Sequence, residues 1–490
     1  MKRRILAMLL VLCFCFSAVA LTSCADNSSG ASESSGNTNH NESSGNNNTP
    51  ADIPTFDITK DVTITFYHTM GSNLRDVLER YIVEFNKLYP NIKIEHEQVG
   101  SYDDVRSRIS QEIPVGNQPN IAYCYPDHVA LYNMAKAVET LDDYIASTAT
   151  ITREDGSTEI LGLTQNQIDD FIQGYYNEGK QFGDGKMYTM PLSKSTEVLY
   201  YNKTFFDKHN LTPPATWDEL EALCAKIKSL DPDSIPLGYD SESNWFITMC
   251  EQQGSPYTSA TGDHFLFDNE QNRAFVKRFR DWYQKGYVTT QEISGGYTSE
   301  LFTKAESEKG NSYMSIGSSA GATHQRPDKV DETYPFEVGI ATIPQVDASN
   351  PKVISQGPSL CIFKNADKQE VIASWLFVKY LTTNVEFQAE FSMASGYVPV
   401  IKSVGENEVY KNEFLSKADG GDFISALSAK ICLEQEAAYY TSPAFYGSSV
   451  ARDQVGLLMQ QCLSNSASDV DKLIKKAFED AVAECEYQAD

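Results

Sequence analysis

Residues 62–88 read VTITFYHTMGSNLRDVLERYIVEFNKL, and this stretch predicts the class of fold. Apolar residues alternate with threonine over residues 62–66, which is the period of a half-buried strand. After a short loop, apolar residues return at helical spacing over residues 74–88, as in an amphipathic helix. The stretch therefore predicts a strand, a loop and a helix, the first unit of an α/β fold.

The same alternation continues along the chain. Pro90 ends the first helix, a strand restarts at Ile92, residues 102–113 have a helical pattern, and residues 120–125 predict a third strand. A second series of strands and helices begins near Gln165. This order predicts parallel, doubly wound sheets covered by helices, and the chain is long enough for two such lobes.

A capping box predicts where one helix of the second series begins. Thr216 and Glu219 have the spacing of a capping box, in which each side chain binds the backbone N–H of the other. We therefore expect a helix that begins at Trp217.

The N-terminus has the features of a lipoprotein signal. A Lys-Arg-Arg segment precedes the apolar run of residues 5–20, and Cys24 follows Leu-Thr-Ser. The pattern resembles the bacterial lipobox, so we expect residues 1–23 to be removed and the Cys24 thiol to carry a diacylglycerol. A retained membrane span is the alternative, but the run is barely long enough and no basic cluster follows it.

Residues 24–51 predict a lipid-anchored, flexible tether. They are mostly Asn, Ser, Gly and Thr without Phe, Tyr or Trp, so they cannot bury enough apolar surface to fold. A flexible chain of this length reaches roughly 30 Å. The predicted location is the extracellular face of a bacterial cytoplasmic membrane, with the globular body beginning at about Asp52.

The charge of the chain excludes one class of partner. The formal net charge is −27, and removal of the three basic signal residues without any acid leaves −30. Such a charge repels phosphate backbones, so we expect no nucleic-acid partner. We expect a monomer.

The cysteines do not predict a disulfide framework. Cys13 and Cys15 leave with the signal and Cys24 is acylated, which leaves an odd number in the body. The remaining cysteines lie in apolar strand-like or helix-like runs, where small buried hydrophobic side chains are expected.

Several segments, in their order along the chain, resemble the extracellular solute-binding proteins of ABC importers, the family of the maltose-binding and glycerol-phosphate-binding proteins. These segments are FNKLYP at 85–90 followed by IKIE at 92–95, GKMYTMP at 185–191, LYYNKTFF at 199–206, PATWDEL at 214–220, WLFVKYL at 375–381 and SGYVPV at 395–400. Each one is weak alone, but the ordered set covers nearly all of the chain after the tether.

The resemblance implies a specific architecture and function. It implies two α/β lobes with a central ligand cleft and crossing hinge segments, of the type II periplasmic-binding-protein kind. The expected boundaries are 52–165 and 317–365 for lobe 1, and 166–316 and 366–490 for lobe 2. The implied function is capture of a small solute by lobe closure for the membrane permease subunits of an ABC importer, with no cofactor.

Candidate ligand residues follow from the chemistry of sugars, which need aromatic platforms and groups that hold paired hydroxyls. The aromatic candidates lie in loops or at predicted element ends: Tyr67, Tyr102, Tyr125, Trp245, Tyr397, Phe445 and Tyr446. Asp103 and Asp127 follow predicted strands, at the edge where open parallel sheets bind ligands. The alternatives are core packing for each aromatic ring and a helix cap or solvated acid for each carboxylate.

A second set comes from the resemblance to the glycerol-phosphate binders. The residues that fall at or beside the ligand motifs of those proteins are His68, Tyr102, Asp103, Ser195, Ser318 or Ser319, Gly357 and Tyr397. Trp245 resembles their cleft tryptophan. They also carry a phosphate-binding arginine near the position of Phe445-Tyr446-Gly447, whereas the nearest arginine here is Arg452. We therefore expect a carbohydrate, mono- or oligosaccharide, with glycerol phosphate or a glycerophosphodiester as the alternative.

One motif indicates an enzyme of a different class, a surface glycan hydrolase. Residues 317–321 read GSSAG and match the nucleophile motif G-x-S-x-G. In hydrolases with this motif the acid and then the histidine follow the serine, but His324 is the only histidine after Ser319. Because five residues leave no room for that order, and no metal or P-loop motif is complete, we expect no enzyme, metal or nucleotide chemistry.

Overall fold

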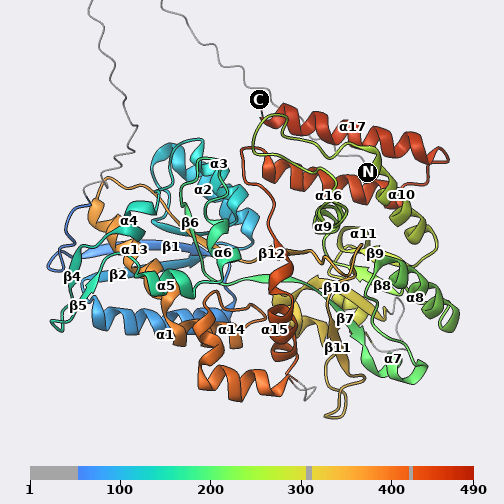
Figure 1. Ribbon diagram of the computed structural model, residues 1–490, viewed down its shortest axis with the longest axis horizontal. Coiled ribbons are helices and arrows are strands. Elements are labelled where there is room, and N and C mark those ends of the chain that lie inside the picture. Colours follow the sequence, from blue (N-terminus) through green and yellow to red (C-terminus); the bar gives the residue numbers. More distant parts are fainter. Residues whose placement is uncertain (1–52, 305–311, 419–422, 490) are drawn as a thin grey trace, which may run out of the picture. The chain divides into compact units, whose positions relative to one another are not determined.

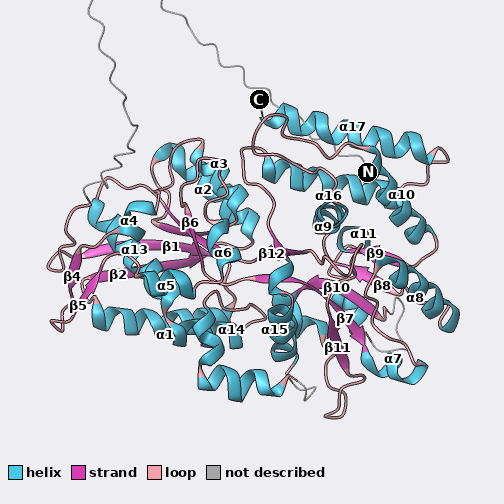
Figure 2. Ribbon diagram, in the orientation of Figure 1, coloured by secondary structure: helices cyan, strands magenta, loops and turns pink. Residues whose placement is uncertain are grey.

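The computed structural model describes residues 53–304, 312–418 and 423–489. The predicted signal peptide, the predicted acylation site Cys24 and the predicted tether of residues 24–51 lie outside these residues. Within the described part, no helix is both long enough and apolar enough to cross a membrane. Figure 1 shows the order of the elements and Figure 2 shows the helices and strands.

The described chain alternates between short strands and helices. The strands are β1 Val62–His68, β2 Ile92–Gln98, β3 Ile121–Cys124, β4 Thr150–Thr152, β5 Thr158–Ile160, β6 Thr189–Pro191, β7 Ser195–Asn202, β8 Leu237–Tyr239, β9 Val288–Thr290, β10 Met314–Ser318, β11 Val338–Ala341, β12 Val353–Gln356, β13 Ser359–Ile362 and β14 Tyr439–Tyr440. The α-helices are α1 Ser72–Leu88, α2 Tyr102–Glu112, α3 Pro126–Asn133, α4 Asp142–Ala146, α5 Gln165–Asp170, α6 Gln173–Glu178, α7 Lys203–His209, α8 Trp217–Leu230, α9 Glu242–Gln253, α10 Glu270–Gln284, α11 Gln291–Ser294, α12 Ser299–Phe302, α13 Lys368–Thr383, α14 Val385–Met393, α15 Ile424–Glu434, α16 Ser448–Ser464 and α17 Val470–Ala489. A 3₁₀ turn that borders the site, η2, spans Ser319–Gln325.

The first sheet has the strand order β2-β1-β3-β13-β6. β1 is parallel to β2 and β3, as predicted, but β13 is antiparallel to both of its neighbours, β3 and β6. The prediction of an all-parallel sheet is therefore wrong at β13, because this strand enters from the second sheet rather than through a crossover helix. α13 covers the sheet, and its Phe377 packs against Phe66 of β1 and Phe85 of α1.

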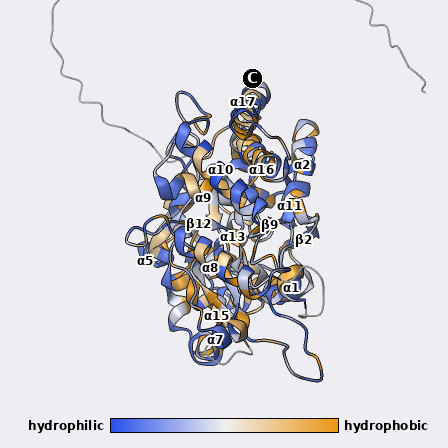
Figure 3. Cartoon of the chain, turned by 90° about the vertical axis from the view of Figure 1, so that its right-hand side faces the viewer, coloured by the Kyte–Doolittle hydropathy of each residue, from blue (hydrophilic) through white to orange (hydrophobic). Residues whose placement is uncertain are grey.

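The second sheet has the order β14-β12-β7-β10-β8-β9, and β11 also pairs with β7. β8, β9 and β10 are parallel, whereas β7 is antiparallel to β10, β11 and β12. α8, α9, α10, α16 and α17 contribute to its core. α16 and α17 lie side by side in Figures 1 and 3, with Ile474, Phe478 and Cys485 of α17 buried at helical spacing.

The predicted capping box at the start of α8 is confirmed. Thr216 is the N-cap, its hydroxyl accepts from the Glu219 N–H at 3.2 Å, and the Glu219 carboxylate accepts from the Thr216 N–H at 3.3 Å. The helix begins at Trp217, whose ring is buried in the core of the second sheet.

Two segments pass directly from one sheet to the other. Residues 192–194 join β6 to β7, and residues 357–358 join β12 to β13. Lys194 is completely buried between them, with its ammonium 2.7 Å from a Glu178 carboxylate oxygen and 3.0 Å from the Ser359 hydroxyl. Its backbone pairs with Val398, which brings a third stretch of chain to the same place.

The sheets divide the chain differently from the expected lobe boundaries. β6 lies in the first sheet although 166–316 was expected in lobe 2, and β11 and β12 lie in the second sheet although 317–365 was expected in lobe 1. α13 packs on β1 of the first sheet, although residues 366–490 were expected in lobe 2. These strands are three or four residues long, too short to indicate by their own pattern which sheet they join.

Candidate functional site

A pocket of about 830 Å³ lies where loops and helix ends from both sheets meet. Its wall from the first sheet comes from the start of α2 and of α3, with Tyr102, Asp103, Arg106, Tyr125, Asp127 and His128. Its wall from the second sheet comes from β7, β10, α9 and η2, among others, with Glu197, Asp240, Asn244, Ser318, His324 and Gln325. Gln356 of β12 and Arg452 and Asp453 of α16 complete the site. We call this space the large pocket.

Five predicted site residues line the large pocket together: Tyr102, Asp103, Tyr125, Asp127 and Ser318. The first four follow strands of the first sheet, where sheet topology predicts ligand contacts. Local capping places two of them: Ser101 caps α2 in a capping box with Asp104, so Tyr102 is the first helical residue. Tyr125 is the N-cap of α3, held in extended backbone by Pro126 in the first turn.

Three tyrosines form a stack at this wall, which we call the tyrosine stack. The Tyr102 ring lies 4.5 Å from Tyr125 and 6.2 Å from Tyr123, with interplanar angles of 24° and 16°. Burial raises the pKa of each phenol well above its usual value, so all three stay protonated at neutral pH and can donate hydrogen bonds. A flat aromatic surface with a hydroxyl edge suits the C–H face and hydroxyls of a sugar.

Glu197 gives the opposite wall a buried carboxylate that the sequence analysis did not select. Its two carboxylate oxygens accept from the Tyr239 hydroxyl at 2.6 Å and from the Asn244 amide at 2.9 Å. Burial has the largest effect and raises the pKa of Glu197 to about 7. The hydrogen bonds from Tyr239 and Asn244 lower the pKa but have smaller effects. A charged residue directly before the apolar run of residues 198–201 in β7 was the signal that could have selected it.

Two arginines also line the pocket, which corrects part of the sequence argument. Its distance in sequence from Phe445-Tyr446-Gly447 predicts that Arg452 does not serve the site, but α16 begins at Ser448 and places Arg452 on the pocket wall. It donates to the Asn244 side-chain oxygen. Arg106 lies 3.1 Å from Asp103 and 3.8 Å from Asp453, so acids of this chain already accompany its charge.

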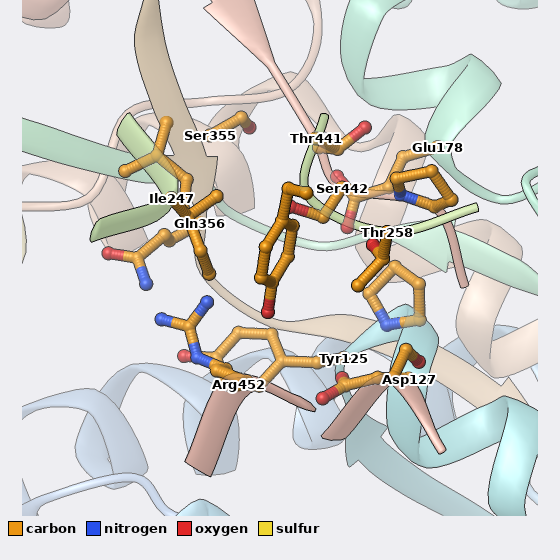
Figure 4. A pocket seen from close by; sticks show the side chains of 15 residues that line it. Tyr125, Asp127, Glu178, Ile247, Thr258, Ser355, Gln356, Thr441, Ser442 and Arg452 are labelled. Atoms are coloured by element: carbon orange, nitrogen blue, oxygen red, sulfur yellow. The ribbon is translucent and has the colours of Figure 1, made fainter. Parts of the chain in front are cut away.

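A smaller cavity adjoins the large pocket, and we call it the inner chamber (Figure 4). Its volume is about 80 Å³, and it shares Tyr125, Asp127, Gln356 and Arg452 with the large pocket. Its remaining wall includes Glu178, Ile247, Thr258, Ile354, Thr441 and Ser442. Its lining combines apolar side chains with several hydroxyl groups.

Trp245 does not line either cavity, contrary to the interpretation of it as a cleft platform. It is fully buried, with its ring 4.9 Å from Tyr239 and 4.1 Å from Phe279. Its neighbour Asn244 does line the large pocket. Because successive helical residues point about 100° apart, the turn of α9 that presents Asn244 to the pocket directs Trp245 into the core.

Tyr67 and His68 lie at the end of β1, away from both cavities. The Tyr67 ring stacks under the Arg108 guanidinium at 4.3 Å, and its hydroxyl accepts from Arg108 at 2.8 Å. His68 is buried and makes a 2.9 Å hydrogen bond with His96, and burial lowers its pKa to about 3. These contacts fit packing, the alternative reading, better than ligand binding.

Four further predicted residues lie at or near the segments that join the sheets. Ser195 pairs with Gln356 in the β7–β12 ladder, and the Ser319 hydroxyl accepts from the Thr196 N–H at 3.2 Å. Gly357 has a φ of 97°, and a Cβ there would lie 2.6 Å from the Ser193 carbonyl oxygen. Tyr397 precedes Val398, whose backbone pairs with Lys194. None of the four is among the residues that line the large pocket or the cavity next to it.

Phe445 and Tyr446 also lie off the pocket walls. Phe445 is buried and stacks on His264 at 4.8 Å, and the Tyr446 hydroxyl donates to the Gln488 carbonyl oxygen at 3.2 Å. They fix the turn that leads into α16, and so help to position Arg452 without facing the solute space.

The described residues offer little for metal or disulfide chemistry. In residues 53–304, 312–418 and 423–489, no three His, Cys, Asp or Glu side chains are placed to share a metal ion. Every cysteine in these ranges is buried and unpaired: Cys124, Cys224, Cys250, Cys361, Cys432, Cys462 and Cys485.

Comparison with known proteins points to one family. A family model described as bacterial extracellular solute-binding protein matches residues 80–417. The sn-glycerol-3-phosphate-binding periplasmic protein UgpB of Escherichia coli K12 is 26% identical over 359 residues, which is 70% of this chain and 75% of the relative. UgpB of Shigella flexneri matches over the same share at the same identity.

Solved structures agree with this chain in fold. The cyclic alpha-maltosyl-1,6-maltose binding protein of Arthrobacter globiformis has a TM-score of 0.65 at 20% identity, and covers 87% of this chain and 100% of its own. UgpB of Mycobacterium tuberculosis in complex with glycerophosphocholine has a TM-score of 0.68 at 17% identity, and the match covers 87% of this chain and 99% of UgpB. The sugar-binding protein MalE of Xanthomonas citri has a TM-score of 0.66 at 17% identity, and the match covers 87% of this chain and 98% of MalE. These likenesses confirm the predicted fold class.

Proposed function

Since this chain belongs to the bacterial extracellular solute-binding proteins, we propose that its large pocket captures a carbohydrate for an ABC importer. Membership confirms the resemblance found in the sequence. It also makes the chain an extracellular binding protein for a small solute and not an enzyme, as predicted. The carbohydrate, the lipid anchor and the permease contacts are the proposal.

The composition of the large pocket supports a neutral, hydroxyl-rich solute. Tyr102 and Tyr125 offer a stacked aromatic surface, while Glu197, Asn244 and Gln356 offer carboxylate and amide groups that can hold paired hydroxyls. Six acidic residues line the pocket against two arginines. This balance disfavours an anion, because a phosphate would meet more negative than positive charge.

Glycerol phosphate or a glycerophosphodiester is the second candidate, and Arg452 is the observation that favours it. A guanidinium on the wall can hold a phosphate in a bidentate contact. However, Arg452 is hydrogen-bonded to Asn244, and Arg106 lies between two aspartates. A phosphate would therefore compete with existing partners of both cations.

Solute capture would proceed by closure around the crossing segments. A solute that touches Tyr125 from the first sheet and Asn244 from the second gains contacts when these walls approach. Such differential contacts shift the protein towards a closed state, which the importer's permease subunits then recognise.

Titration calorimetry and thermal unfolding against sugars, polyols and glycerol phosphates test the proposal. A sugar should bind, and at about 100-fold excess over its Kd it should stabilise the protein by about 2.7 kcal/mol. Binding of glycerol phosphates with no response to any sugar would favour the second candidate. A panel with no response at all would show that the solute class is wrong.

The lipid anchor is a separate part of the proposal, tested through Cys24. Cys24→Ser should release the protein from the membrane fraction, because the predicted acylation position no longer carries a thiol. Solute affinity should stay unchanged, since the site lies within residues 102–453. A Cys24→Ser protein that still sediments with membranes would contradict the anchor.

A further inference from the structure

We propose that the inner chamber is a subsite for a short polyol arm of the bound solute. The inference rests on the proposed function, because it concerns the same solute in the same site. The arm would be the hydroxymethyl edge of a hexose or the glyceryl group of a glycerol phosphate, which share vicinal hydroxyls on a short carbon chain.

The size of the inner chamber sets the size of the arm. Its volume is about 80 Å³, against about 830 Å³ for the large pocket. One water-sized group needs roughly 10–15 Å³, so the chamber holds about six non-hydrogen atoms, or about half of a hexose. A whole sugar ring fits only in the large pocket, with one edge extending into the chamber.

Hydroxyl groups without partners indicate the chemistry of the arm. Within the described residues, the Tyr257 hydroxyl, the Thr258 hydroxyl and the Ser355 hydroxyl are buried and have no hydrogen-bond partner. Burial raises the pKa of Tyr257 well above its usual value, so its phenol remains a donor. Groups that both donate and accept match the hydroxyls of a polyol better than a carboxylate, which only accepts.

The residues that line only the chamber suit the carbon chain of the arm and add no uncompensated charge to that of the shared Asp127 and Arg452. Ile247 and Ile354 offer apolar contact for C–H groups. Glu178 lines the chamber but not the large pocket. The Lys194 ammonium lies 2.7 Å from its carboxylate oxygen and neutralises its charge. Figure 4 shows Glu178, Thr258 and Ser442 around the same space as Tyr125 and Arg452, which also border the large pocket.

The shared wall allows one solute to occupy both spaces. Tyr125, Asp127, Gln356 and Arg452 belong to both linings, so the cavities meet at these four side chains. In this proposal the exocyclic arm of a ring placed on Tyr102 and Tyr125 in the large pocket reaches the chamber between these side chains. The chamber would then select solutes by whether they carry that arm.

The test fills the chamber and compares solutes with and without the arm. Thr258→Phe adds an aromatic ring to the chamber wall, and Thr258→Val is the control that removes only the hydroxyl. Calorimetry compares glucose with xylose, which lacks the hydroxymethyl group, and glycerol 3-phosphate with ethyl phosphate, which lacks the vicinal hydroxyls. Ser442→Leu repeats the filling from another loop if Thr258→Phe shows no cooperative thermal transition.

The unmodified protein should bind the arm-bearing member of one pair at least tenfold more tightly. Filling the chamber should remove this preference without changing the affinity for xylose or ethyl phosphate, and Thr258→Val should lower the preference only a few-fold. The glucose pair would identify a sugar edge and the glycerol pair a glyceryl group. Equal losses for both members of a pair, or no loss, would overturn the subsite.

If the protein binds neither pair, the panel of the proposed function decides the solute class, and the chamber is tested alone with glycerol. Glycerol should raise the Tm of the unmodified protein more than that of Thr258→Phe, because general solvent effects are common to both. Equal shifts in the two proteins would overturn the subsite independently of the solute class.

Discussion

Two clusters of aromatic rings in this protein have similar ring contacts but different surroundings. Trp245 lies between Tyr239 and Phe279 at 4.9 and 4.1 Å and is fully buried. Tyr102 and Tyr125 stack at 4.5 Å and line the large pocket. The contrast shows that an aromatic residue near polar sequence can belong to the core, and that only the direction of its side chain decides between packing and binding.

The largest effect that would test this contrast is on Trp245. Trp245→Ala should lower the free energy of unfolding by about 3–5 kcal/mol, because it leaves a cavity among packed rings. Denaturant unfolding without solute measures the loss, and Trp245→Phe should lose less. Intact stability combined with a large loss of solute affinity would show that Trp245 contacts the solute, and the contrast with Tyr102 and Tyr125 would be wrong.

Glu197 tests the contrast through pH, because its carboxylate joins Tyr239 of the core cluster to Asn244 of the pocket. Its pKa is about 7 in the folded protein against a usual 4.5, so the folded state holds the proton more tightly than the unfolded state. The resulting stability is fully present below about pH 4.5 and is lost as the pH rises to about 7. The loss is about 3 kcal/mol at most.

Glu197→Gln should remove this part of the pH dependence. The free energy of unfolding, measured from pH 4.5 to 7.5, should fall more steeply for the unmodified protein than for the variant. Asp103→Asn is a matched control that removes a carboxylate from a side chain that is 72% exposed. Parallel pH profiles for all three proteins would mean that Glu197 stays ionised throughout.

The smallest expected effect is on Tyr125 in the tyrosine stack. Tyr125→Ala should weaken solute binding by about 1–2 kcal/mol, roughly fivefold to thirtyfold, because the solute loses an aromatic surface. Tyr125→Phe keeps the ring and should retain most of the affinity in calorimetry. If Tyr125→Ala instead lost stability on the scale expected for Trp245→Ala, the stack would be core and the contrast would disappear.

The sequence predicted the features that depend on near neighbours. The strand-loop-helix of residues 62–88 appears as β1 and α1, and the capping box at Thr216 begins α8 at Trp217. The carboxyl ends of β2 and β3 lead to Tyr102 and Tyr125 at the large pocket. Each of these rests on a period, a cap or a strand end, which are written in a few consecutive residues.

The tertiary structure decided what no short window contains. It assigned the short strands β6, β11, β12 and β13 to their sheets, because pairing partners lie far away in the chain. It placed Arg452 on the pocket through the start of α16, and it joined Glu197 of β7 to Asn244 of α9. By itself the sequence determined the family, the α/β class and one wall of the pocket. The opposite wall and the orientation of Trp245 followed from packing, because side-chain direction depends on the helices and sheets that meet around it.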